Sequence, residues 1–239
     1  MEERVHALVS AFLGQAIPVL GPGTSAVVYG SAARGDWDPE WSDINLLLVA
    51  DRVGSAELRA LGPLLAALPP EWRSPPFLFQ RDEWARASDA FPIELADMHQ
   101  AHVVVHGPDP VAGFHPDPGQ LRGAMERELR AKLLHLRQGY ALRAGDPAGL
   151  GDLVRHTLGP VLVLARVGLA LLGRPVPAGS VETLRQFAAA TGGPSAALAE
   201  LATHRREGQW TCPPGLFEGY LESIAAAAAF VDHHLPGAS

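Results

Sequence analysis

Residues 27–49 read VVYGSAARGDWDPEWSDINLLLV. A first apolar run ends at Gly30-Ser31, an Ala-Ala-Arg-Gly segment follows, and a second apolar run opens with Asp43 and Asn45. Short runs rich in Val and Leu between turn residues are typical of strands that are covered on both faces. The segment therefore predicts a strand, a Gly-Ser turn, a loop and a second strand, with eleven residues between Ser31 and Asp43.

The polar side chains of this segment are of the types that hold a nucleoside triphosphate. A Gly-Ser turn at a helix start offers backbone N–H groups and a hydroxyl to phosphate oxygens. The Arg34 guanidinium can donate a bidentate pair of charge-assisted hydrogen bonds to a phosphate. Asp43 and Asn45 lie two residues apart on a strand and so point to the same face, where their oxygens can hold Mg²⁺ against the phosphates. The segment thus predicts a nucleotide site.

Around this segment, the first half of the chain alternates between helical and extended patterns. Helical periodicity covers residues 2–16 and 55–68, and strand-like runs cover residues 25–29, 42–49, 76–80, 91–98 and 102–106. Such alternation is typical of an α/β fold.

The sequence pattern changes after residue 115. The turn-rich run His115-Pro116-Asp117-Pro118-Gly119 is a candidate boundary. Helical patterns follow at residues 121–140, 150–172, 181–190, 195–204 and 216–234. We expect two domains, 1–115 and 116–239, of which the second is all helical.

Composition narrows the class of protein. The chain has 239 residues, of which 47% are hydrophobic, and this is enough to bury a sizeable core. Its net charge of -7 argues against a protein that wraps duplex nucleic acid.

The most apolar stretch, residues 158–172, is shorter than the roughly 20 residues of a membrane span and predicts a buried core helix. The N-terminus lacks the pattern of a secretory signal, and Cys212 is the only cysteine. We therefore expect a cytoplasmic protein without a membrane partner.

The Gly-Ser turn, the gap and the acidic strand together resemble the pattern of the DNA polymerase beta-like nucleotidyltransferase superfamily. In that pattern, Gly-Ser or Gly-Gly is followed, after a gap of similar length, by Asp-hydrophobic-Asp/Glu-hydrophobic. The helical second half resembles the bundle of small antibiotic nucleotidyltransferases of the kanamycin and streptomycin type. The resemblance implies an α/β (α+β) nucleotidyltransferase domain with a mixed sheet, followed by an all-α helical bundle domain.

The resemblance also implies a reaction and a set of site residues. A nucleoside monophosphate would pass from an NTP to a hydroxyl of a small molecule, with release of pyrophosphate and with Mg²⁺ as one or two ions. Gly30, Ser31 and Arg34 would seat the triphosphate. Family members carry a third carboxylate on a later strand, and Ile93-Glu94-Leu95-Ala96-Asp97-Met98 fits that pattern. Glu94 would then bind the metal and act as the base, and Asp97 would support it.

Asn45 departs from the family pattern, where this position is Asp or Glu and helps to ligate both metals. An amide keeps one acceptor oxygen but loses a negative charge, so Mg²⁺ would bind more weakly. The alternative is therefore a catalytically impaired nucleotide-binding protein with the same fold.

Two further positions lie in the helical half. Lys132 is the only lysine in the chain. Since a lysine is a compact cation for phosphate, we expect it near the nucleotide. Arg130 and His135 have an Arg-x4-His spacing that resembles the RNase motif of HEPN domains. A toxin–antitoxin pair fused in one chain is therefore a third candidate class of function.

Overall fold

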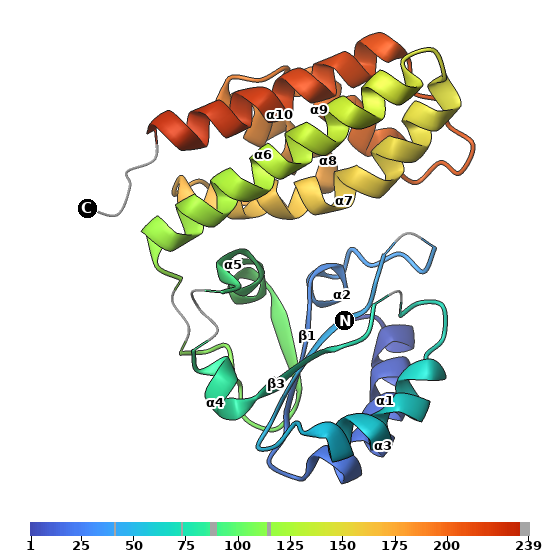
Figure 1. The fold of residues 1–239 in the computed structure, drawn as a ribbon, viewed down its shortest axis with the longest axis vertical. Coiled ribbons are helices and arrows are strands. Elements are labelled where there is room, and N and C mark those ends of the chain that lie inside the picture. Colours follow the sequence, from blue (N-terminus) through green and yellow to red (C-terminus); the bar gives the residue numbers. More distant parts are fainter. Residues whose placement is uncertain (41, 73, 87–89, 114–115, 235–239) are drawn as a thin grey trace. The chain divides into compact units, whose positions relative to one another are not determined.

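The computed structural model describes the chain except for residues 41, 73, 87–89, 114–115 and 235–239, and Figure 1 shows its ribbon. The chain forms two compact units, Met1–Pro116 and Asp117–Ser239.

The first unit is built on a mixed four-stranded sheet. Its strands are β1 (Ser25–Tyr29), β2 (Asn45–Ala50), β3 (Phe77–Gln80) and β4 (His102–His106). The strand order is β3-β2-β1-β4, in which β1 runs antiparallel to β2 and β4, and β2 runs parallel to β3. Its helices are α1 (Glu3–Leu20), α2 (Ser31–Arg34), α3 (Ser55–Ala66), α4 (Arg81–Trp84) and α5 (Pro92–Gln100). The predicted α/β fold with a mixed sheet is confirmed.

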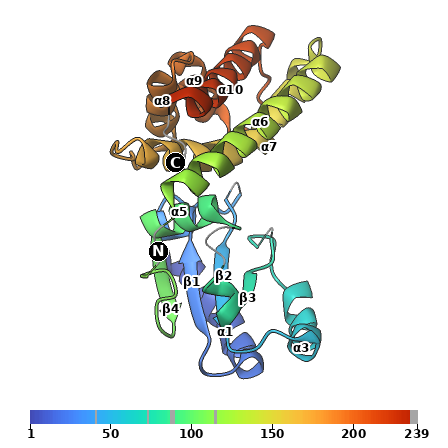
Figure 2. The same cartoon turned by 60° about the vertical axis from the view of Figure 1, so that its left-hand side comes forward.

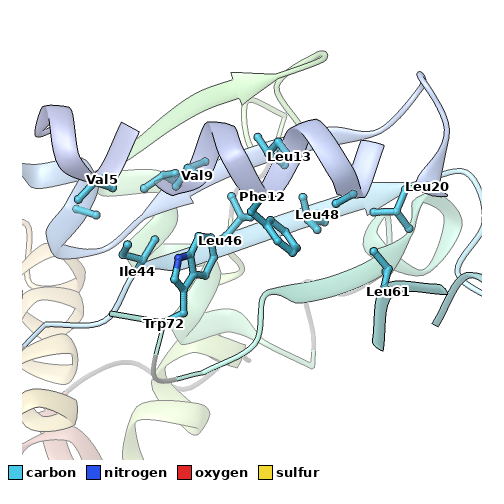
Figure 3. Close-up of a cluster of buried hydrophobic side chains, with 14 of the residues drawn as sticks. Val5, Val9, Phe12, Leu13, Leu20, Ile44, Leu46, Leu48, Leu61 and Trp72 are labelled. Carbon is cyan, nitrogen blue, oxygen red and sulfur yellow. The ribbon is translucent and has the colours of Figure 1, made fainter. Parts of the chain in front are cut away.

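The sheet is covered on both faces, as its apolar central strands predict. Alternate residues of a strand point to opposite faces, and in β1 and β2 both sets are apolar. On one face, Val28, Leu46 and Leu48 pack with side chains of α1 and α3 (Figure 3). On the other face, Val27 and Leu47 belong to a cluster with side chains of α4 and α5. Helices on both faces therefore fix the ends of β1 and β2, where the polar residues lie.

The prediction of a strand over residues 91–98 is wrong, because this segment forms helix α5 (Pro92–Gln100). Pro92 stands in its first turn, where a proline lacks only an N–H that a helix start leaves unpaired anyway. A short apolar run has no periodicity that separates a buried helix from a buried strand. The packing of Leu95 and Met98 against the sheet decides the outcome.

The second unit consists of helices in the residues that the structure describes. They are α6 (Pro118–Arg143), α7 (Pro147–Leu171), α8 (Ser180–Thr191), α9 (Ser195–His204) and α10 (Pro214–His234). Helix α6 packs against α7 and α10, and α8 packs against α9 (Figure 2). The core between them includes the fully buried side chains of Leu129, Leu136, Leu158, Phe217 and Tyr220. The predicted helical region is confirmed.

Helix α7 is long and apolar enough, by length and composition, to cross a membrane. Within its apolar window, 67% of the residues are buried inside the protein, as in a core helix.

Candidate active site

The site begins at Gly30, which ends β1 and starts the single-turn helix α2. Its φ of +74° lies in the region that favours glycine. A Cβ atom at this position would lie 2.9 Å from Asn45 Nδ2 and 4.0 Å from Arg34 Nη2. Tyr29 and Asn45 are partners in the β1–β2 register, so the turn stands beside the start of β2. Gly30, Arg34 and Asn45 therefore meet at one point.

Helix α2 returns the Arg34 side chain to this point. The Arg34 N–H donates to Gly30 O at 3.1 Å and the Gly35 N–H donates to Ser31 O at 3.0 Å, which closes one helical turn. Gly35, with φ of +83°, then ends the helix in the left-handed conformation. Ser31, half-buried, is its first residue. The Gly-Ser turn predicted from the sequence thus exists, and Arg34 folds back over it.

A buried ion pair fixes the Arg34 guanidinium. Arg34 Nη1 donates to Asp97 Oδ1 at 3.0 Å, and the two side chains are only 15% and 6% exposed. The Asp36 carboxylate lies near the other side of the group, with its Oδ1 3.8 Å from Arg34 Nε. Buried guanidinium–carboxylate pairs hold a defined geometry because the planar fork restricts how they meet. Helix α5 therefore positions a residue of the β1–β2 loop.

Tyr29, the last residue of β1, gathers three carboxylates around it. Burial raises the pKa of its hydroxyl, and the negative charges of Glu94, Asp97 and Asp43 raise this pKa further. Asp43, just before β2, and Glu94 and Asp97, on α5, therefore lie close enough to act on one hydroxyl. Sequence reasoning missed Tyr29; its place directly before the Gly-Ser turn was the available signal.

Part of the first unit is similar to a known family. Residues 15–90 match the family model described as a nucleotidyltransferase domain. Residues 15–90 of the first unit are thus similar to a nucleotidyltransferase domain. The resemblance predicted from the Gly-Ser turn and the acidic strand is confirmed.

The fold of the chain is also similar to that of spectinomycin adenyltransferase AAD(9) from Enterococcus faecialis, solved with ATP and spectinomycin. The TM-score is 0.62 at 11% sequence identity, over 97% of this chain and 100% of that one. No curated protein sequence matches the chain. The similarity thus extends beyond the nucleotidyltransferase domain to the fold of the helical unit.

The sequence predicted that Glu94, the expected third carboxylate, lies on a strand, and this placement is wrong. Glu94 stands on α5. Strand β2 pairs with β1 on one side and with β3 on the other, and β3 reads Phe77-Leu78-Phe79-Gln80 and carries no acid. Phe77 instead contacts Tyr29, with ring centroids 6.3 Å apart. Glu94 therefore lies on a helix that covers the sheet, and its role as ligand or base stays a prediction.

The oxygen-bearing side chains of the candidate site are of the kind that Mg²⁺ prefers. Asp43 and Asn45 offer hard oxygen atoms from the start of β2, and Mg²⁺ prefers one or two carboxylates and keeps several waters. Among the described residues, no group of three or more His, Cys, Asp or Glu side chains is arranged to hold a metal ion. A Mg²⁺ ion here would therefore draw its remaining ligands from water and the nucleotide.

Three candidate residues belong to the helical unit. Lys132 Nζ lies 3.7 Å from Glu128 Oε2, and the expected approach of Lys132 to the phosphates stays a prediction. Arg130 donates to Glu126 at 3.0 Å and to Asp232 at 2.7 Å. His135 lines a cavity of about 510 Å³ between α6 and α7. The Arg130 guanidinium is thus paired with two carboxylates, whereas His135 lines the cavity and is not part of that group.

Proposed function

We propose that this protein transfers a nucleoside monophosphate from an NTP to a hydroxyl of a small molecule and releases pyrophosphate. The observation that carries the proposal is the meeting of Arg34 and Asn45 at Gly30, beside carboxylates, within a nucleotidyltransferase domain. A positive group, backbone N–H groups and carboxylates at one turn suit a triphosphate with its metal. In this proposal the domain spans residues 1–115 and the helical bundle spans residues 116–239.

Each residue of the site has a proposed task. The Gly30–Ser31 turn and Arg34 bind the triphosphate, with Lys132 as a further cation. Asp43, Asn45 and Glu94 hold Mg²⁺, which when bound supplies positive charge to the triphosphate and to the leaving pyrophosphate.

Glu94 is the proposed base. It accepts the proton of the acceptor hydroxyl while the hydroxyl oxygen forms a bond to the α-phosphorus. The bond from that phosphorus to the bridging oxygen breaks, and the electron pair leaves with pyrophosphate.

ATP and a cationic acceptor are the proposed substrates. The fold is similar to that of an enzyme solved with ATP and spectinomycin. The net charge of -7 favours the approach of a cationic acceptor such as an aminoglycoside. We place this reaction in the cytoplasm, since the chain has a single, buried thiol.

Asn45 favours a second candidate function, a nucleotide-binding protein that has lost most turnover. A neutral amide at this position removes one negative charge from the metal site. Under this alternative, the native protein binds an NTP without transferring label, and Asn45→Asp gains Mg²⁺-dependent transfer.

The test is transfer of label from NTPs labelled at the α-phosphate to a panel of aminoglycoside and aminocyclitol acceptors. We expect Asp43→Ala to lower transfer by about 10³-fold, because a metal ligand supports several kcal/mol of charge stabilisation. The matched control is Asp51→Asn, which removes an exposed Asp whose Oδ1 accepts from Arg81 Nε at 2.8 Å. Transfer that survives Asp43→Ala would refute the proposal. RNase activity that His135→Ala abolishes would favour the third candidate class, a toxin–antitoxin pair fused in one chain.

A further inference from the structure

Three phenylalanine rings form a row on the face of the sheet that α5 covers. Phe77 and Phe79 stand two residues apart on β3, at one end of the strand order, and so point to the same face. Phe91, directly before α5, contacts both, at centroid distances of 6.3 Å to Phe77 and 5.6 Å to Phe79. Phe77 in turn contacts Tyr29 at 6.3 Å. This aromatic wall of Phe77, Phe79 and Phe91 therefore extends from the end of β1 to the start of α5.

Phe91 is the outer ring of the aromatic wall. The residue is 37% exposed, although it packs on two other rings. It occupies the N-cap of α5, where Ser, Thr, Asp and Asn are preferred because their side chains accept a hydrogen bond from the helix start. A phenyl ring cannot accept in this way. Phe91 thus contributes packing but no cap, and the exposed part of its ring is available to a ligand.

Phe91 also lies beside the residue that acts on the acceptor in the proposed reaction. Glu94, the proposed base, stands three residues after Phe91 at the start of α5, and residues three apart are neighbours on a helix surface. The acceptor hydroxyl must come within hydrogen-bond reach of the base that takes its proton. The part of the acceptor that surrounds this hydroxyl therefore falls beside the ring of Phe91.

The charges near the aromatic wall favour a ligand with amino groups. At its inner end the wall meets a group of carboxylates, since Phe77 contacts Tyr29. This group consists of Asp43, Glu94 and Asp97. A protonated amine over an aromatic ring is attracted by the negative face of the ring, and nearby carboxylates add to that attraction. The C–H groups of a saturated ring pack on the same surface by dispersion. A ring compound that carries amines satisfies both requirements.

We propose that Phe91, supported by Phe77 and Phe79, holds the ring of the acceptor and contacts one of its protonated amines, and so determines specificity for amine-bearing ring compounds such as aminocyclitols. The inference rests on the proposed function, since it requires that the acceptor hydroxyl reach Glu94. It adds to that function a residue that selects the acceptor without taking part in the chemical step.

The first experiment measures kcat and the KM values for ATP and for the best acceptor of the panel, in the native protein and in Phe91→Asn. Asparagine is a preferred N-cap residue, so α5 keeps its start while the ring is lost. We expect the KM for the acceptor to rise about 5- to 30-fold, with kcat and the KM for ATP within about twofold of the native values. Phe91→Tyr should keep the native KM because it keeps the ring, whereas Phe91→Leu should resemble Phe91→Asn.

The matched control is Leu58→Gln on α3. It removes another exposed apolar side chain of the same unit, since Leu58 is 46% exposed. Helix α3 packs on the opposite face of the sheet, so both KM values should stay at their native level. Circular dichroism and thermal unfolding verify that each variant folds.

The second experiment compares the same acceptor with its N-acetylated form, which has lost the positive charge. We expect the native protein to favour the free amine about 10-fold or more in kcat/KM, and Phe91→Asn to favour it about 3-fold or less. An equal preference in the two proteins would overturn this inference and leave the proposed function standing. An unchanged acceptor KM in Phe91→Asn, or a rise in the KM for ATP instead, would do the same. A native protein that transfers label to no acceptor of the panel would overturn both.

Discussion

Asn45 is the residue at which this site differs from the motif that it resembles. It stands at the start of β2, in register with Tyr29 and against Gly30. A carboxylate here would share this point with the Arg34 guanidinium, which Asp97 already pairs. The amide at Asn45 therefore adds no further negative charge beside a guanidinium that Asp97 and Asp36 already neutralise.

Gly30 permits this close approach, and its replacement gives a direct test. Gly30→Ala would adopt a backbone conformation reserved for glycine and would press on Asn45, so we expect a loss of about 1–3 kcal/mol in unfolding free energy. We also expect a weaker affinity for ATP. Urea unfolding and calorimetry measure the two effects.

The matched control is Gly35→Ala, at the other end of α2. Gly35 also has a positive φ, but a Cβ atom there would meet nothing within 4 Å. It should cost only about 1 kcal/mol and leave ATP affinity intact. Equal effects of the two variants on affinity would contradict the view that Gly30 shapes the site.

At the scale of elements, α5 is the clearest difference between prediction and structure. The sequence pattern placed Glu94 on a later strand, whereas it lies on a helix that covers one face of the sheet. Strands β1 and β4 and helix α9 have the bounds that the sequence predicted. Those segments are bounded by turn residues, while residues 91–98 carry no local feature that outweighs packing.

Gly151 on helix α7 lies close to the backbone of Trp210, and this contact gives a prediction at the scale of elements. A Cβ atom on Gly151 would lie 2.3 Å from the carbonyl oxygen of Trp210, in backbone that cannot rotate away. We expect Gly151→Ala to lower the unfolding free energy by more than about 2 kcal/mol, as overpacking against a fixed neighbour does.

Gly159→Ala in the same helix is the control. A Cβ atom there would meet nothing within 4 Å. Because alanine favours helices over glycine, we expect a gain of about 0.5–1 kcal/mol. Urea unfolding measures both variants, and a loss at both positions would point to the helix backbone and not to the contact with Trp210.

At the scale of the whole molecule, all three tyrosines of the chain resist ionisation. Burial raises the pKa of Tyr29 and of Tyr220, and a hydrogen bond to Glu218 raises that of Tyr140. Absorbance at 295 nm should therefore show a smaller phenolate step near pH 10 in the folded protein than after unfolding in urea.

The same shifts set how stability changes with alkaline pH. The folded state holds these protons more tightly than the unfolded state, whose ordinary tyrosine pKa is 10.0. The unfolding free energy should stay constant with respect to these groups below about pH 10 and fall as the pH rises above it. Three tyrosines that titrate near pH 10 in the folded protein would contradict this prediction.

The sequence by itself determined the local elements of this protein. Nearly continuous apolar runs in β1 and β2 required cover on both faces, and glycine and serine between them required a turn, because these preferences belong to short segments. Only the tertiary structure decided that α5 is a helix and that Asp97 holds Arg34, 63 residues away in the chain. Such pairs depend on how a helix packs on a sheet, and no local preference encodes that packing.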